Sequence, residues 1–175
     1  MRISRIFPVI EGKLYQVEYE ESGVRAFDEL RYQWKDTEWL YKFFRQYKKD
    51  LDALTEPLKL AGAVKLAMKD ANELFENLLD YGGTNLSELF RPLFGREGEI
   101  KDNQPQKTRV ERPKTWLRIY AVHYDGKYII TGGAIKLTQT MNTRPHLKTE
   151  LYKLELLRKK LESDISDDSL GYLEL

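Results

Sequence analysis

The dipeptide Asp125-Gly126 constrains the fold of this chain more than any other feature, because it lies between two runs rich in β-branched and aromatic residues. Such a pair favours a two-residue turn between antiparallel strands. The sequence therefore predicts a hairpin over residues 116–137, WLRIYAVHYDGKYIITGGAIKL. A turn of this length also fixes the register, which places Tyr120 opposite Thr131 and Arg118 opposite Gly133.

Two adjacent glycines, Gly132 and Gly133, weaken the second strand of this hairpin, since glycine costs a strand both entropy and side-chain packing. In the predicted register, Arg118 has no side chain opposite it and can reach a planar or phosphate ligand. The alternative is that Arg118 lies at the solvated end of the sheet and the glycines mark a bulge or twist. Strict alternation points Lys136 away from Arg118, whereas a one-residue bulge at the glycines would bring both onto one face.

The rest of the chain reads as strands, then helices, then the hairpin and a last helix. Residues 14–20 alternate in polarity and predict a strand, paired with an upstream edge strand across the turn Glu11-Gly12-Lys13. Apolar spacing predicts helices at about 24–34, 37–51, 58–79 and 145–161. The predicted fold is α+β: a small antiparallel sheet packed with N-terminal helices and an amphipathic C-terminal helix.

We expect a single domain over residues 1–165, with a helical insertion at about 58–94 and a polar loop at about 95–107. An acidic tail at 166–175 either folds onto the basic part of the chain or is disordered. No apolar run approaches the length of a membrane span, so a soluble, cytoplasmic protein is expected.

The near-neutral net charge of +1 hides an uneven distribution. Residues 106–160 hold 13 Lys and Arg against 4 Asp and Glu. A concentrated positive segment is typical of a site for a polyanion, nucleic acid first, although a solvated basic helix face is the simpler interpretation. The candidate RNA-binding residues are Lys107, Arg109, Arg112, Lys114, Gln139, Arg144 and Lys148.

Composition narrows the chemistry that such a site can perform. The chain has no cysteine and two histidines, and few carboxylates lie in the basic segment, so we expect neither a metal site nor a cofactor. Metal-free cleavage of RNA by its own 2′-hydroxyl needs a base, an acid and cations that stabilise the phosphorane. Arg118 and Lys136 are the candidate cations, and Tyr120 or His146 is the candidate proton-transfer group. His146 follows Pro145 at a helix start, where a surface or capping role is the alternative.

Residues 116–161 resemble the C-terminal half of the RelE/HigB-type toxins of bacterial toxin–antitoxin pairs, within the RelE/ParE superfamily. The likeness rests on Arg118-Ile119-Tyr120 and on a glycine followed by an apolar pair, lysine, Thr-Gln and a helix-opening proline. These are Gly133, Ile135, Lys136, Thr138, Gln139 and Pro145. Leu137 and Thr140 stand where that family often has further lysines.

The resemblance implies a small α+β fold, a metal-independent endoribonuclease that acts on mRNA, commonly at the ribosome, and a neutralising helix-turn-helix antitoxin. Two alternatives remain open: a non-catalytic protein-interaction domain of the same fold, and an RNA-binding domain that does not cleave.

Overall fold

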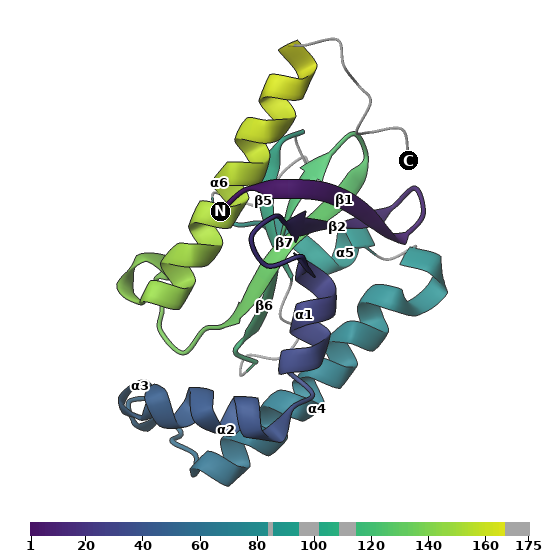
Figure 1. The fold of residues 1–175 in the computed structure, drawn as a ribbon. Helices are drawn as coiled ribbons and strands as arrows, with labels where there is room; N and C mark the ends of the chain where they lie inside the picture. Colours follow the sequence, from purple (N-terminus) through teal and green to yellow (C-terminus); the bar gives the residue numbers. More distant parts are fainter. Residues whose placement is uncertain (84–85, 95–101, 109–114, 167–175) are drawn as a thin grey trace.

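The computed structural model describes residues 1–83, 86–94, 102–108 and 115–166, and it arranges them around a seven-stranded sheet (Figure 1). The strand order is β1-β2-β7-β6-β5-β4, and β3 pairs with β2 outside this path. The strands are β1 (Ile3–Ile10), β2 (Leu14–Tyr19), β3 (Val24–Arg25), β4 (Phe90–Pro92), β5 (Gln104–Thr108), β6 (Leu117–Tyr124) and β7 (Lys127–Ile135).

The sheet is larger than predicted, and it is mixed rather than antiparallel. Strand β2 runs parallel to β7, while the other pairs in the described residues are antiparallel. Strand β3 replaces the start of the first predicted helix, and two further strands lie in segments that were predicted otherwise: β4 in the helical insertion and β5 in the polar loop. Both are short and carry Pro, Gln or Arg instead of alternating β-branched residues, so neither gives a strand signal of its own. They are strands because β5 pairs with β6 and β4 pairs with β5.

The predicted helices form, with small changes at their ends. They are α1 (Ala26–Gln33), α2 (Thr37–Gln46), α3 (Lys48–Asp52), α4 (Leu60–Leu79), α5 (Leu86–Leu89) and α6 (Pro145–Ser166), with 3-10 turns at Asp80–Gly83 and Met141–Thr143. The helix predicted over 37–51 is divided into α2 and α3 at Tyr47. No helix in the described parts of the chain is long and apolar enough to cross a membrane.

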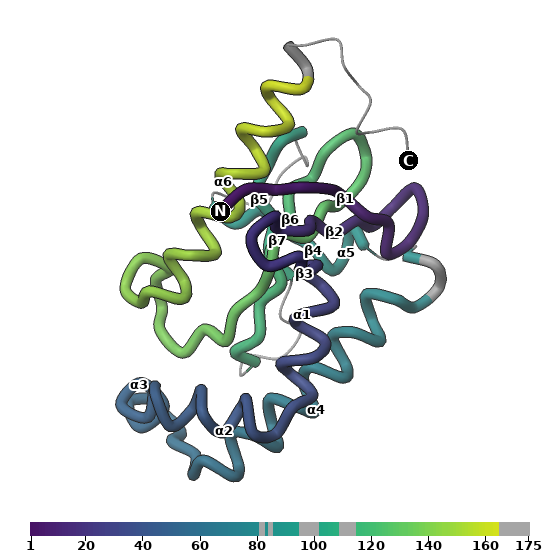
Figure 2. Tube along the Cα trace, viewed as in Figure 1, coloured from purple at the N-terminus to yellow at the C-terminus, as the bar shows by residue number. Residues whose placement is uncertain are grey.

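Helices cover both faces of the sheet, and the two glycines of β7 show how closely they approach. A Cβ added at Gly132 would lie 3.1 Å from Cδ of Glu150 in α6, and one at Gly133 would lie 2.8 Å from Cδ1 of Leu30 in α1. Consecutive residues of a strand face opposite sides. Helices α6 and α1 therefore pack on opposite faces at this point, while α2, α3 and the start of α4 lie beyond the end of the sheet (Figures 1 and 2).

The predicted hairpin is confirmed at its turn and corrected further along. Asp125 and Gly126 both have positive φ, 47° and 70°, as a turn of this type requires. The predicted register holds from the turn as far as the pair Ala121 and Ile130, and then shifts by one residue. Tyr120 pairs with Gly132 and Arg118 with Ala134, so Arg118 does not lie opposite a glycine.

The shift is a one-residue bulge at Thr131, directly before the glycines where the sequence suggested one. Beyond the bulge, the strand partners place Ala134 on the face of Arg118, and Lys136, two residues further, lies on that face too. The backbone N–H of Lys136 still donates to the carbonyl of Trp116, 2.8 Å away, so the pairing of the two strands continues to this point. The bulge thus brings Arg118 and Lys136 to the same side of the sheet.

Candidate functional site

A pocket of about 730 Å³ lies on the sheet face that α6 partly covers. It is next to the segment that connects β7 to the start of α6. Four cationic side chains line it; we call it the cation pocket. They are Arg91, Lys107, Arg118 and Lys136. Polar groups of Thr108, Gln139, Thr140 and Asn142 complete one part of its wall, and Leu93, Phe94, Tyr120, Met141 and Leu151 another. No Asp or Glu is among the described residues that line it.

The sheet register explains why these cations converge. Arg91 of β4 pairs with Lys107 of β5, and Lys107 pairs with Tyr120 of β6. Side chains of directly paired residues point to the same face. Arg118, two residues from Tyr120, and Lys136 lie on that face too. Strands β4, β5 and β6 and the residue directly after β7 each contribute to one positive surface, although these residues are far apart in sequence.

Burial and repulsion between neighbouring positive charges lower the pKa values of two of these cations, Lys107 and Lys136. Burial lowers the pKa of Lys136 below its usual value, and the charges of Arg118 and Lys107 lower it further. The pKa of Lys107 is lowered by burial and then by Arg118 and Arg91. No carboxylate in the described part of the chain forms an ion pair with Lys107, Arg118 or Lys136. A bound anion would relieve this repulsion, so the pocket is electrostatically suited to a phosphate.

Backbone carbonyls, rather than carboxylates, hold two of the cations in place. Nη1 of Arg118 donates to the carbonyls of Thr115 and Leu117, each 2.8 Å away. Nζ of Lys136 donates to the carbonyl of Gln139. These neutral partners fix the direction of the two side chains and add no negative charge beside them. The pocket is therefore preorganised for an anion.

Tyr120 lines the cation pocket but is poorly suited to act as a base. Its side chain is fully buried, and its hydroxyl donates to Sδ of Met141 over 3.0 Å. Burial raises the pKa of Tyr120 above its usual range, and the charge of Glu150 adds to this rise, although Arg118 opposes it. The phenol therefore stays protonated near neutral pH, and a role in packing or as a hydrogen-bond donor fits its position.

His146, the other candidate for proton transfer, is not among the residues that line the pocket. Its Nε2 donates to the carbonyl of Ile135 over 3.0 Å, and its ring packs against the rings of Phe43 and Tyr47 in and beside α2. Burial lowers the pKa of His146, which favours the neutral ring. The half-buried side chain joins the start of α6 to α2, which is a packing role and differs from the surface or capping role given as the alternative for this residue.

The other predicted RNA-binding residues are divided between the pocket, the remaining surface and segments outside the described residues. Lys107 and Gln139 line the pocket. Arg144 forms a two-pronged ion pair with Asp50 of α3, and Lys148 is exposed on α6 outside the pocket lining. Arg109, Arg112 and Lys114 lie outside the residues that the structure describes.

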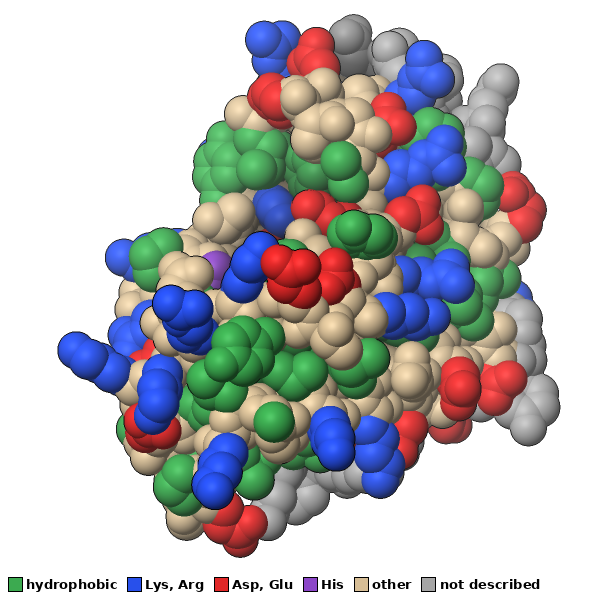
Figure 3. All heavy atoms as spheres, turned by 60° about the horizontal axis from the view of Figure 1, so that its bottom comes forward, with side chains coloured by type: hydrophobic (Ala, Val, Ile, Leu, Met, Phe, Trp, Pro, Cys, Tyr) green, Lys and Arg blue, Asp and Glu red, His purple; other side chains and the backbone are tan. Residues whose placement is uncertain are grey.

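Sequence reasoning missed Arg91, Phe94 and Asn142. Arg91 lies in the segment predicted as a helical insertion, outside the basic segment, and the tripeptide of β4 has no periodicity that would mark it as a strand. Phe94 follows it, 65% exposed at the pocket wall. On the face of the molecule shown in Figure 3, at the α2–α4 end, Lys and Arg side chains are mixed with acidic and hydrophobic ones. Among the described residues that line the cation pocket, by contrast, none is acidic.

Comparisons of the chain with protein-family models, with curated proteins and with solved structures found no match. Within the described residues, no group of three or more His, Asp or Glu side chains is placed to hold a metal ion.

Proposed function

We propose that this chain binds RNA in the cation pocket and cleaves it without a metal ion, as a RelE/HigB-like toxin. The observation that carries the proposal is the convergence of Arg91, Lys107, Arg118 and Lys136 in one pocket whose described lining has no carboxylate. The resemblance of residues 116–161 to that family supports the same conclusion, since Arg118, Lys136 and Gln139 belong both to the shared pattern and to the pocket.

The reaction that fits this set of groups is transesterification within the RNA. The 2′-oxygen attacks the adjacent phosphorus, the P–O5′ bond breaks, and the products are a 2′,3′-cyclic phosphate and a free 5′-hydroxyl. Lys107 or Lys136, whose pKa is lowered, accepts the 2′-hydroxyl proton, and the other lysine, still protonated, donates a proton to the leaving O5′. Arg118 stabilises the extra negative charge on the phosphorane.

The natural substrate on this proposal is mRNA, taken on the ribosome in the cytoplasm, and a helix-turn-helix antitoxin is the neutralising partner. RNA binding without cleavage is the second candidate function. It is favoured by the burial of Tyr120 and by the position of His146 outside the pocket, because neither predicted proton-transfer group is placed as a base.

Cleavage of a translated mRNA by the purified protein, with EDTA present throughout, tests the proposal. We expect Arg118→Ala to slow cleavage by about 100-fold or more, as the loss of one charge-stabilising donor does in other enzymes. It should also reduce the dependence of log Kd on log salt concentration by about one unit for RNA binding. The cleavage rate of the wild type should rise with pH until the lysine that acts as base is neutral.

Lys65→Ala is the matched control, because it removes one positive charge from an exposed position on α4, outside the cation pocket. It should leave cleavage unchanged. Loss of cleavage in EDTA, or full activity of Arg118→Ala with unchanged circular dichroism, would contradict the proposed enzyme. Binding that depends on Arg118 without any cleavage would assign the second function.

A further inference from the structure

A second, smaller pocket of about 330 Å³ adjoins the cation pocket, and the two share Leu93, Phe94 and Leu151 as a common wall. Phe94 is the most exposed of these residues, with 65% of its surface accessible. Because its ring borders both pockets, a molecule that fills both must pass over it. We call the smaller one the aromatic pocket.

The two pockets differ in whether their charged side chains have partners within the protein. In the aromatic pocket, Nη1 of Arg158 donates to Glu155 over 3.1 Å, and its Nε donates to the carbonyl of Asn103 over 3.0 Å. Asp102 accepts the backbone N–H of Asp125 over 3.0 Å and lies 3.7 Å from His123. Its charged side chains thus already have partners within the protein. The cation pocket, by contrast, has Lys107, Arg118 and Lys136 without carboxylate partners among the described residues.

A nucleotide has the same two parts, a charged phosphate and a neutral, flat base. Pro105 and Leu154 add apolar surface to the aromatic pocket, and Asn103 and Gln104 add polar edges. Exposed aromatic rings beside a basic groove bind single-stranded RNA by stacking on its bases. Pockets lined by apolar side chains with a few polar groups are typical of binding sites for flat organic ligands.

We propose that the aromatic pocket is a nucleobase subsite, in which Phe94 stacks on the base next to the phosphate held by the cation pocket. This inference rests on the proposed function, since it takes RNA as the ligand, and it adds a positioning residue and a preference for single-stranded RNA. In a duplex the bases are stacked on one another, so their faces are not accessible to Phe94.

The test compares two ligands with the same number of phosphates: a 2′-O-methyl uridine decamer, which cannot be cleaved, and an abasic decamer. Phe94→Leu keeps the apolar volume and removes the ring. We expect it to weaken binding of the uridine decamer about 5- to 150-fold and binding of the abasic decamer less than about twofold. Tyr152→Leu, which removes an exposed ring of α6 outside both pockets, should leave both affinities unchanged.

A second readout is independent of affinity. In Phe94→Trp, the uridine decamer should quench the fluorescence of the new tryptophan, relative to the same titration of the wild type, and the abasic decamer should not. Equal effects of Phe94→Leu on both decamers, or no quenching, would overturn the inference while the proposed function stands, provided that Arg118→Ala weakens both. If the wild type binds neither decamer and instead binds an acidic peptide, the proposed function fails and both pockets are assigned to a protein partner.

Discussion

At the scale of single residues, Gly132 and Gly133 show how one strand can lie between two helices. The Cβ of any other residue at 132 would meet the carboxylate of Glu150, with Nζ of Lys153 3.2 Å away. At 133 it would lie 2.7 Å from the carbonyl oxygen of Arg118 and 2.8 Å from Leu30. The glycines therefore have a structural role in this strand. They let α6 and α1 pack closely on its two faces.

Replacing Gly133 with alanine should destabilise the protein. A backbone oxygen and a core leucine both lie too close to the new methyl group, and neither can move without shifting a strand or a helix. We expect Gly133→Ala to lower the free energy of unfolding by about 1–3 kcal/mol, the range for an overpacked core. Urea denaturation followed by circular dichroism measures this change.

Gly62→Ala is the matched control for that substitution. Gly62 lies in the first turn of α4, where an added Cβ would have Leu58 Cβ at 4.0 Å, an ordinary contact. Alanine is the better helix former, so this variant should be as stable as the wild type or more stable by up to about 1 kcal/mol. If the Gly133→Ala protein is as stable as Gly62→Ala, the close contact between α1 and β7 at Gly133 is contradicted.

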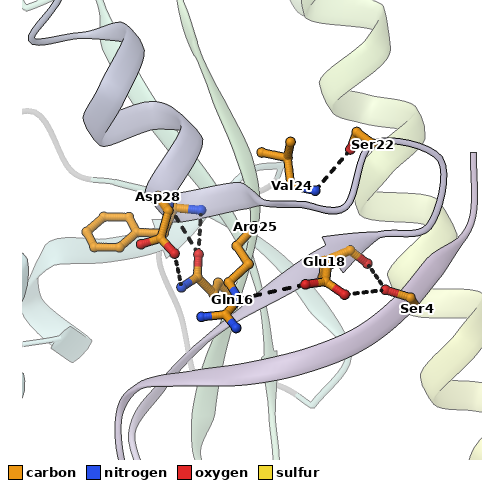
Figure 4. Close-up of polar contacts among 8 residues, drawn as sticks. Ser4, Gln16, Glu18, Ser22, Val24, Arg25 and Asp28 are labelled. Atoms are coloured by element: carbon orange, nitrogen blue, oxygen red, sulfur yellow. Dashed lines mark hydrogen bonds and ion pairs between the residues drawn. The ribbon is translucent and has the colours of Figure 1, made fainter.

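At the scale of elements, β2 provides the cap that α1 lacks in its own sequence. Arg25 occupies the N-cap position of α1 and makes no side-chain hydrogen bond there. Instead, Oε1 of Gln16 accepts the backbone N–H groups of Phe27 and Asp28, at 2.9 and 3.2 Å, and its Nε2 donates to Asp28 (Figure 4). The alternation of residues 14–20 predicts an exposed Gln16, whereas the structure buries it to cap the helix.

Removing this cap should cost stability without disturbing the strand. Gln16→Leu keeps a side chain of similar size but leaves two backbone N–H groups of α1 without their acceptor, so we expect a loss of about 1–3 kcal/mol. Gln33→Leu, at the other end of α1, removes one hydrogen bond to Glu29 and should change stability by about 0.5 kcal/mol or less. Thermal unfolding of the two variants provides the comparison, and equal melting temperatures would contradict the capping role of Gln16.

At the scale of the whole molecule, one buried carboxyl group lies where three elements meet. Glu150 of α6 sits against Gly132 of β7, and its partner Lys153, 2.8 Å away, lies over the ring of Tyr19 in β2. Oε2 of Glu150 has no hydrogen-bond partner among the described residues. Burial raises the pKa of Glu150 to about 7, against the lowering effect of Lys153 and with a further rise from Glu29 of α1.

This raised pKa predicts a pH dependence of stability with a definite sign. The pKa is higher in the folded protein than its ordinary value of 4.5, so the folded state binds the proton more tightly than the unfolded state does. The stabilisation is complete below about pH 4.5 and is lost as pH rises through about 7. Glu150→Gln cannot ionise, so its stability relative to wild type should increase by up to about 3 kcal/mol from pH 4.5 to 8.

Urea unfolding of both proteins across this pH range measures the difference, in which the other titrating groups largely cancel. Glu155→Gln is the control, because Glu155 is an exposed carboxylate of the same helix and forms only surface ion pairs. A pH-independent difference between Glu150→Gln and the wild type would contradict the raised pKa.

The sequence by itself determined those features that depend on residues close to one another along the chain. The turn at Asp125-Gly126, the strand at residues 14–20 and the leucine spacing of α6 all follow from local preference or from burial of one face. They were sufficient to predict an α+β fold and a basic surface that includes Arg118, Lys136, Lys107 and Gln139. They were also sufficient to suggest a bulge near the glycines.

Tertiary structure alone decided which strands pair with each other and which side chains line the cation pocket. Nothing local predicts that β2 runs parallel to β7, or that β4 brings Arg91 beside Lys107, because pairing between distant segments depends on how the whole chain packs. For the same reason, His146 and Arg144 could be predicted as charged or titratable side chains at the start of α6 but not as contacts to α2 and α3. Local sequence specifies which side chains a strand or helix presents, and only the packing of those elements decides which of them meet.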